Sequence, residues 1–362
     1  MSRAYLVLSD GAVYPGEAIG APGESTGELV FTTGMAGYLE TLTDPSYAGQ
    51  IILQTFPLIG NYGLIPEDFE GAARCNGYVV QECCDTPSNF RSMGRLEDFL
   101  KEKGIVGISG VDTRAVTRHL REYGTMNARI CKTVPSDLSE IAAWSMGDVV
   151  AVAGAGKRED YFAVGEEKYR VALMNYGAKG SIVRALRERG CAVTVLPENA
   201  LADEVLALHP DGLMLSNGPG DPKENPKRIR EIKKLAGKLP IFGICLGHQL
   251  LALALGGDTV KLPFGHRGVN QPVYEEATGR TWITSQNHGY AVVSESMRGL
   301  GTLSFRNAND GSCEGLDYPA IDSFSVQFHP EARSGPKDTE FLFDRFLERM
   351  EGYRHAKGQK HP

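Results

Sequence analysis

The stretch from Leu239 to Leu251 constrains the fold of this chain most strongly, because a single cysteine, Cys245, stands there between two glycines. The apolar run before the cysteine predicts a buried strand, and the residues rich in Leu and Ala at 250–255 predict a helix. A turn this tight strains the backbone of its central residue, and Gly243 and Gly247 let the strand and the helix pack closely. The sequence therefore predicts a strand, a sharp turn that carries a thiol, and a helix.

This arrangement is typical of a nucleophile elbow in which sulfur replaces the more usual hydroxyl. The thiol of Cys245 would face the unpaired N–H groups at the start of a helix, and these groups stabilise the thiolate form. An isolated cysteine is more often an inert buried residue. The flanking glycines and the preceding strand favour a nucleophile here.

Composition and length limit the classes of protein to which the chain can belong. Its 362 residues suggest two domains, each large enough for its own core. The net charge of −7, without a long basic run, argues against a nucleic-acid binder. No stretch is typical of a signal peptide or a membrane span, so we expect a cytoplasmic protein without membrane contact. Neither the cysteines nor the histidines fall at metal-ligand spacings, so we expect no metal.

The order of patterns along the chain predicts the domain organisation. We expect an N-terminal α+β domain over residues 1–147, a linker over 148–168, a second domain over 169–355 and a tail over 356–362. The first domain mixes short strand patterns, at residues 5–8, 28–32, 51–55, 77–81 and 126–130, with helical ones. Its best helix is expected at 112–122, where Asp112 can cap the first turn. No group that could carry chemistry stands out in this domain from its residues alone.

The Gly-Lys pair in the expected linker does not form a phosphate-binding loop. Ala151 stands where the first glycine of such a loop should be, and Arg158 replaces the Ser or Thr that holds magnesium. We therefore expect no nucleotide site in this chain.

The second domain alternates apolar strands with amphipathic helices. Strands are expected at 170–174, 192–196 and 212–216, and helices at 179–189, 202–208 and 227–236. This alternation predicts an α/β fold with a doubly wound, mostly parallel sheet, whose ligands bind beyond the carboxyl ends of the strands. Shorter strands and turns are expected from 259 to 328, followed by a closing helix at 338–350.

A second informative stretch ends a buried strand with the triplet His329-Pro330-Glu331. Because side chains at i and i+2 leave a strand on one side, Glu331 can accept a hydrogen bond from His329 and fix its tautomer. Together with Cys245 these residues would form a triad of nucleophile, general acid/base and orienting carboxylate. Alone, the triplet is weak evidence, because a turn would explain it equally well.

Turn-forming residues also follow the strand expected at 212–216. The run Ser216-Asn217-Gly218-Pro219-Gly220-Asp221 would expose backbone N–H groups that can bind an anion. The N–H groups of Gly220 and Leu246 could hold an oxyanion that forms when Cys245 attacks a carbonyl. A plain surface turn is the alternative interpretation.

These motifs carry a resemblance to known proteins. Gly243–Gln249 together with His329–Glu331 resembles a class I, triad-type glutamine amidotransferase domain, and the whole chain resembles the small, glutamine-hydrolysing subunits of carbamoyl phosphate synthetases. The resemblance covers residues 4 to 350. The further stretches that carry it are Gly34–Tyr38, Leu42–Gln50, Gly60–Gly63, Gly110–Arg114, Thr117–Arg118, Gly265–Val273 and Thr284–Tyr290.

The resemblance implies a reaction and a substrate. Cys245 would attack the side-chain amide of L-glutamine to give a glutamyl thioester. His329 would protonate the departing ammonia and later activate water, and Glu331 would steady His329. The resemblance also implies a set of residues around the glutamine, of which Ser46 would come from the N-terminal domain: Ser46, Gly218, Gly220, Leu246, Gln249, Asn287, Gly289 and Tyr290.

The resemblance further implies a partner. The ammonia would pass to a large synthetase subunit that makes carbamoyl phosphate from bicarbonate and ATP, so ATP and magnesium would bind only there and this chain would hold no cofactor. A heterodimer or a higher oligomer would result, serving arginine synthesis, pyrimidine synthesis or both. Two positions depart from the family pattern: Asn175 stands where Asp is common, and Tyr290 stands where Phe is frequent.

Two other classes of function remain open at this point. A cysteine peptidase or esterase could use the same elbow, although nothing in the sequence suggests a peptide groove. A non-catalytic regulatory or assembly protein is the other alternative, for which an intact triad would be unusual. Release of glutamate from free glutamine would favour the amidotransferase, and labelling of Cys245 by a glutamine-like chloroketone would argue against a non-catalytic role.

Overall fold

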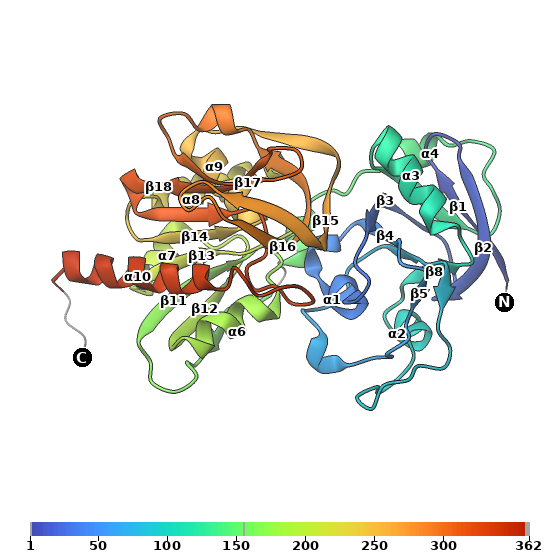
Figure 1. Cartoon of the computed structure of the whole chain (residues 1–362), viewed down its shortest axis with the longest axis horizontal. Coiled ribbons are helices and arrows are strands. Elements are labelled where there is room, and N and C mark those ends of the chain that lie inside the picture. The colour runs from blue at the N-terminus through green and yellow to red at the C-terminus, as the bar shows by residue number, and fades with distance from the viewer. Residues whose placement is uncertain (1, 155, 359–362) are drawn as a thin grey trace. The chain divides into compact units, whose positions relative to one another are not determined.

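The computed structural model describes residues 2–154 and 156–358. The chain divides into two compact units, Met1–Val149 and Val150–Pro362, and the boundary falls within helix α5 (Val149–Ala153). Figure 1 shows the first unit in blue to teal and the second in green to red. No helix in the described part of the chain is both long enough and apolar enough to cross a membrane. The last four residues of the expected tail lie outside the described residues.

The first unit is built around a closed barrel with the strand order β1, β2, β8, β6, β4, β3, β9. The barrel strands are β1 (Arg3–Leu8), β2 (Val13–Gly20), β3 (Ser25–Thr32), β4 (Gln50–Gln54), β6 (Gly77–Val79), β8 (Val106–Ser109) and β9 (Met126–Cys131). Every residue of β4 is buried, which explains its continuous apolar run, because helices cover the outside of the barrel. Ile52 of this strand belongs to the same core cluster as Leu39 and Leu100 from two of those helices.

Short helices complete the first unit. They are α1 (Tyr38–Thr43), α2 (Leu96–Glu102), α3 (Thr113–Tyr123) and α4 (Ser139–Ala142), with the 3-10 turns η1 (Pro45–Tyr47) and η2 (Pro66–Asp68) and a small sheet of β5 (Leu58–Ile59) and β7 (Glu82–Cys83). The Oδ1 atom of Asp112 accepts a hydrogen bond from the Ala115 N–H at 2.9 Å. The predicted cap and helix are therefore confirmed, and all five expected strands are present.

The second unit contains a ten-stranded sheet with the order β10, β12, β11, β13, β14, β19, β18, β17, β15, β16. The five strands from β12 to β19 run parallel, and the pairs on either side of them are antiparallel. The strands are β10 (Glu159–Tyr161), β11 (Tyr169–Asn175), β12 (Cys191–Pro197), β13 (Gly212–Leu215), β14 (Ile241–Ile244), β15 (Thr259–Glu275), β16 (Thr281–Val292), β17 (Thr302–Asn307), β18 (Cys313–Tyr318) and β19 (Ser323–Val326).

Helices cover both faces of this sheet, as a doubly wound fold requires. The helices are α6 (Gly180–Glu188), α7 (Ala202–Ala207), α8 (Pro226–Leu235), α9 (Leu246–Leu255) and α10 (Phe341–Ala356). Alternate residues of β11 face opposite sides: Ala172 and Met174 pack with α7, α8 and α9, whereas Val171 and Leu173 pack with α6 and α10. Figure 1 shows the long red helix α10 and the green helix α6 in this unit. The predicted α/β fold class is confirmed.

Two segments differ from the pattern expected from the sequence. The segment 148–168, expected to be a linker, holds helix α5 and strand β10, and β10 pairs with β12 as the outermost strand of the sheet. In the region from 259 to 328, where short strands are expected, β17, β18 and β19 are short, but residues 259–292 form the long strands β15 and β16. Irregularities between Lys261 and His266 and between Gly268 and Gln271 interrupt their pairing. Such breaks hide the length of a strand because the side-chain alternation shifts at each one.

The sheet order brings three chemically interesting segments together at the carboxyl ends of neighbouring strands. Strands β13, β14 and β19 are neighbours and run parallel. The loop that begins at Ser216, the cysteine turn and His329 each follow the carboxyl end of one of these strands. This is the edge at which open α/β sheets bind their ligands.

We predict that Phe242→Ala strongly destabilises the second unit. The ring of Phe242 stacks on Phe324 with 4.4 Å between centroids and packs against Phe343 and Phe346 at 5.7 Å. Its removal leaves a cavity that costs about 3–5 kcal/mol. Urea unfolding followed by circular dichroism should show a lower midpoint. Phe162→Ala, at a position that is 82% exposed, is the control, and equal midpoints for the two variants would contradict this account of the core.

Candidate active site

The turn between β14 and α9 has the strained geometry that the sequence predicts. Cys245 has φ 54° and ψ −105°, in a region that residues with side chains rarely adopt. A Cβ atom on Gly247 would lie 2.3 Å from the carbonyl oxygen of Leu215, and one on Gly243 would lie 2.8 Å from the carbonyl carbon of Gly247. Both glycines are therefore required by the close packing of strand and helix, and helix α9 begins at Leu246, directly after the cysteine.

His329 lies in a buried position beside this turn. Its backbone N–H donates to the Ser285 carbonyl at 2.9 Å, which fixes the chain just beyond β19. Its Nδ1 donates to Oε1 of Glu331 at 2.7 Å, because a carboxylate can only accept. Burial lowers the pKa of His329, and the positive charge of Lys179 lowers it as well. The charge of Glu331 and the hydrogen bonds with Cys245 and Glu331 together outweigh these effects and raise the pKa to about 10.

The Nε2 atom of His329 is the ring nitrogen left for chemistry. It is buried, and no described residue gives it a hydrogen bond of good geometry. In the neutral form of the ring this nitrogen carries the lone pair, since Nδ1 holds the proton shared with Glu331. The structure thus brings Cys245, His329 and Glu331 together, and it holds the ring so that its neutral form would accept a proton at Nε2.

Glu331 also contacts a buried lysine, Lys179, which was not predicted from the sequence. The Nζ atom of Lys179 lies 3.1 Å from Oε1 of Glu331, and both side chains are buried. Burial raises the pKa of Glu331. The positive charges of Lys179 and His329, with the hydrogen bond from His329, lower the pKa by more than burial raises it, so the net shift is downward. The carboxylate therefore stays ionised inside the protein.

The loop after β13 is tied to the cysteine turn. The N–H of Gly247 donates to the carbonyl of Ser216 at 3.0 Å. A Cβ atom on Gly218 would lie 2.8 Å from Leu246 Cδ2, so these two predicted site residues are neighbours. Gly220 has φ 89°, which favours glycine at this position. The Leu246 N–H is the first of helix α9, so it has no acceptor within the helix and can donate to a substrate oxygen.

Strand β16 supplies another group of predicted residues. The Sγ atom of Cys245 lies 3.7 Å from the carbonyl oxygen of Asn287. The carbonyl of Tyr290 accepts from Nε2 of Gln249 at 2.9 Å, and Gln249 also donates to Oε1 of Gln327 at 2.9 Å. One group of contacts near Cys245 therefore includes Asn287, Tyr290 and Gln249. Gln327 is a buried member of this network that was not predicted from the sequence.

Gly289 and Ser46 complete the set of predicted residues. Gly289 lies beside a guanidinium, because a Cβ atom there would be 3.3 Å from Nη2 of Arg267. Ser46 belongs to the first unit, in the turn η1, where its N–H donates to Oδ1 of Asp44 at 2.9 Å. The expected contribution of Ser46 to the site stays a prediction.

Asn175, which departs from the family pattern, keeps the bonding that an aspartate would provide. Its Oδ1 accepts from the N–H groups of Gly177 at 3.1 Å and Ala178 at 2.9 Å. The substitution therefore preserves the turn that leads into α6.

One feature of the sequence could have revealed Lys179. The residue directly precedes helix α6, where the positive end of the helix dipole disfavours a cation. A lysine that is buried at such a place needs a nearby anion. The sequence alone could not say which carboxylate supplies it, because the partner follows a distant strand.

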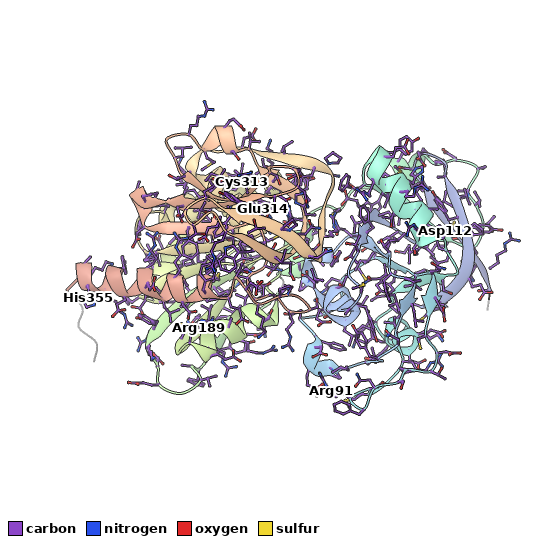
Figure 2. The ribbon with its side chains drawn as sticks, viewed as in Figure 1. Arg91, Asp112, Arg189, Cys313, Glu314 and His355 are labelled. Atoms are coloured by element: carbon purple, nitrogen blue, oxygen red, sulfur yellow. The ribbon has the colours of Figure 1, made fainter. Side chains whose placement is uncertain are left out.

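Among the described residues, His266, His288 and Glu314 have donor atoms close enough to hold a metal. Figure 2 labels Glu314 beside Cys313 on β18. The side-chain NH₂ of Asn307 donates to Glu314 at 3.2 Å and lies 3.3 Å from Nδ1 of His266. The N–H of Asn309 fixes that amide by donating to its oxygen at 2.9 Å. An NH₂ group that points at the donor atoms repels a cation, so this set fits a hydrogen-bonded network better than a metal site.

Both units match known protein families. Residues 6–130 match the family described as "Carbamoyl-phosphate synthase small chain, CPSase domain", and residues 172–349 match "Glutamine amidotransferase class-I". These two matches agree with the resemblance stated from the motifs.

Similar proteins match over nearly the whole chain, and all three described here are named carbamoyl phosphate synthase small chain. The protein from Listeria innocua is 49% identical and aligns with 98% of this chain and 100% of its own length. The one from Syntrophotalea carbinolica is 48% identical, with 98% of this chain and 100% of its own length covered. The one from Bacillus thuringiensis is 49% identical, with 97% of each chain covered.

We predict that Gly247→Ala lowers the thermal unfolding midpoint. The added methyl group would meet the Leu215 carbonyl, so the helix must move away from the sheet, at a cost of about 1–3 kcal/mol. Gly352→Ala is the matched control, because nothing lies within 4 Å of a Cβ atom there and alanine favours the helix. Differential scanning calorimetry of both variants measures the effect, and an unchanged midpoint for Gly247→Ala would show that the turn does not need its glycine.

Proposed function

Because the chain belongs to the family of carbamoyl phosphate synthase small chains, we propose that it hydrolyses L-glutamine to glutamate and ammonia for a large synthetase subunit. The observation that carries this proposal is the placement of Cys245 at a strained turn beside His329, whose Nδ1 is held by Glu331. This arrangement supports the roles of nucleophile, general acid/base and orienting carboxylate for the three residues.

The first half of the reaction transfers the glutamyl group to sulfur. The Nε2 atom of His329 takes the thiol proton of Cys245, and the sulfur attacks the carbon of the glutamine side-chain amide. The negative charge on the amide oxygen is held by the N–H groups of Leu246 and Gly220, each donor contributing about a hundredfold to a thousandfold in rate. His329 then returns its proton to the nitrogen, the C–N bond breaks, and ammonia leaves a glutamyl thioester on Cys245.

The second half hydrolyses the thioester. His329, again neutral, takes a proton from water as the oxygen attacks the thioester carbon. The C–S bond breaks, glutamate leaves, and the proton on His329 returns to the sulfur of Cys245. Glu331 holds the imidazole orientation throughout and stabilises the imidazolium that forms twice in each cycle.

The remaining predicted residues would form the glutamine pocket. Asn287, Gly289 and Tyr290 follow one another along β16 near the cysteine, and Gln249 is held against Tyr290 by its own amide. Gly218 leaves room beside Leu246 because it lacks a side chain. Ser46 would reach the same substrate from the first unit.

The partner implied by the family is the large subunit, in a heterodimer or a higher oligomer. ATP and magnesium would bind to that subunit, which uses the ammonia and bicarbonate to make carbamoyl phosphate, and this chain would need no cofactor. A cytoplasmic location, and a product used for arginine synthesis, pyrimidine synthesis or both, fit this role.

We predict that Cys245→Ser abolishes glutamine-dependent synthesis of carbamoyl phosphate by the complex, because a serine at this position is a far weaker nucleophile. Synthesis from added ammonium chloride should persist, since the ATP-dependent steps belong to the partner. Cys84→Ser, a half-buried cysteine of the first unit, is the control and should keep both activities. Glutamine-dependent synthesis by Cys245→Ser at the control rate would refute the assignment. Cleavage of peptides or esters instead of glutamine would point to a hydrolase of another class.

A further inference from the structure

We propose that His266 is a positioning residue for glutamine binding, which anchors the part of strand β16 that carries Asn287 and Tyr290. This role rests on the proposed function, because both of these residues belong to the proposed glutamine pocket. It explains why charged groups that take no part in the reaction steps are buried beside β16. The carboxylate of Glu314 is the most deeply buried of these groups.

The backbone alone leaves this part of β16 weakly attached to the sheet. Among the described residues, β15 pairs with β17 over Val273–Glu275 and joins the sheet there. Residues 266–268 of β15 lie beyond this pairing and pair with β16, with His266 opposite His288. Irregularities interrupt the pairing of β15 with β16 on both sides of residues 266–268. Side-chain contacts are therefore needed to hold these residues against the sheet.

Two carboxylates supply such contacts, because they hold the ring of His266 from both sides. Its Nδ1 donates to Oε1 of Glu314 at 3.2 Å, and its Nε2 donates to Oδ2 of Asp310 at 2.9 Å. A carboxylate can only accept, so the ring carries two protons and a positive charge. Burial lowers the pKa of His266, but Glu314 and Asp310 outweigh burial and raise it. His266 thus ties β15 to the hairpin that β17 and β18 form.

Glu314 is the inner anchor of this contact. Its side chain is fully buried, and Nδ2 of Asn307 donates to the same Oε1 at 3.2 Å. Burial raises the pKa of Glu314, but the hydrogen bonds and charges of His266 and His288 lower it to about 2. The carboxylate therefore stays ionised. A buried ion pair of this kind adds little net stability, so we attribute its benefit to the single arrangement that it fixes.

His288 connects this anchor to the pocket. Its ring lies at 90° to the ring of His266, with 4.9 Å between the centroids. Its Nδ1 donates to the carbonyl of Tyr290 at 2.9 Å, because a carbonyl oxygen can only accept. The ring of His288 thus bonds to the backbone of its own strand within the segment 287–290. A fixed His266 ring keeps that ring in place, and with it the backbone that would surround the glutamine.

The test is the kinetics of Glu314→Gln in complex with the large subunit. The variant keeps the shape of the side chain but removes the charge that holds His266. We expect KM for glutamine to rise about tenfold, the order of one lost hydrogen bond to a charged group. The value of kcat should stay close to that of the wild type, because the triad is left intact. Asp258→Asn, at an exposed ion pair with Lys223, is the matched control and should leave KM unchanged.

A second measurement separates positioning from a general loss of structure. Without ligand, iodoacetamide should alkylate Cys245 of Glu314→Gln at the wild-type rate. Protection of Cys245 by L-glutamate, the product, should require about tenfold more glutamate than in the wild type. If the single variant does not fold, the double variant His266→Gln/Glu314→Gln replaces it in both experiments, because it leaves no unpaired buried charge.

Three results would overturn the inference and leave the proposed function intact. The first is a wild-type KM and wild-type protection by glutamate in the neutral variant. The second is a fall in kcat and a changed alkylation rate at an unchanged KM, which would place the effect in the triad. The third is unfolding of both variants, which would show a purely structural role. A wild-type complex that releases no glutamate would instead overturn the proposed function.

Discussion

The close contact of helix α9 with the neighbouring strands β13 and β14 is the constraint on which the rest of the site depends. The contact leaves no space for side chains at Gly243 or Gly247, so the chain must turn within one residue. That residue is Cys245, which is forced into a backbone conformation that side chains usually avoid. The strain costs of order 1–3 kcal/mol and is held by the buried sheet around it. Because of this turn, the sulfur is fixed at the start of helix α9, beside the carboxyl ends of the neighbouring strands.

The charges around Glu331 are the second feature on which the site depends. Burial on its own would neutralise a carboxylate, yet the site needs Glu331 as an anion. Glu331 meets this need because it lies between two cationic partners, Lys179 and His329. The acid–base properties of the triad are therefore a property of four side chains from three segments of the chain, which the parallel sheet brings to one edge.

Local features of the sequence predicted much of this account. The cysteine turn, the His329–Glu331 pair and the order of strands and helices in the second unit each follow from residues that are close in the chain. Features that depend on distant contacts were not predicted. Closure of the first unit into a barrel needs β1 to pair with β9, and the role of Lys179 depends on a carboxylate that follows β19. Periodicity reports which face of an element is buried, but not what lies against it.

The most direct test of the central claim is to trap the intermediate on the sulfur. The complex with its large subunit is mixed with glutamine, quenched in acid during turnover, digested and examined by peptide mass spectrometry. The account predicts a glutamyl group on the peptide that contains Cys245, and its loss when the mixture is left until the glutamine is consumed. Release of glutamate without any adduct on that peptide, or with an adduct on another cysteine, would contradict it.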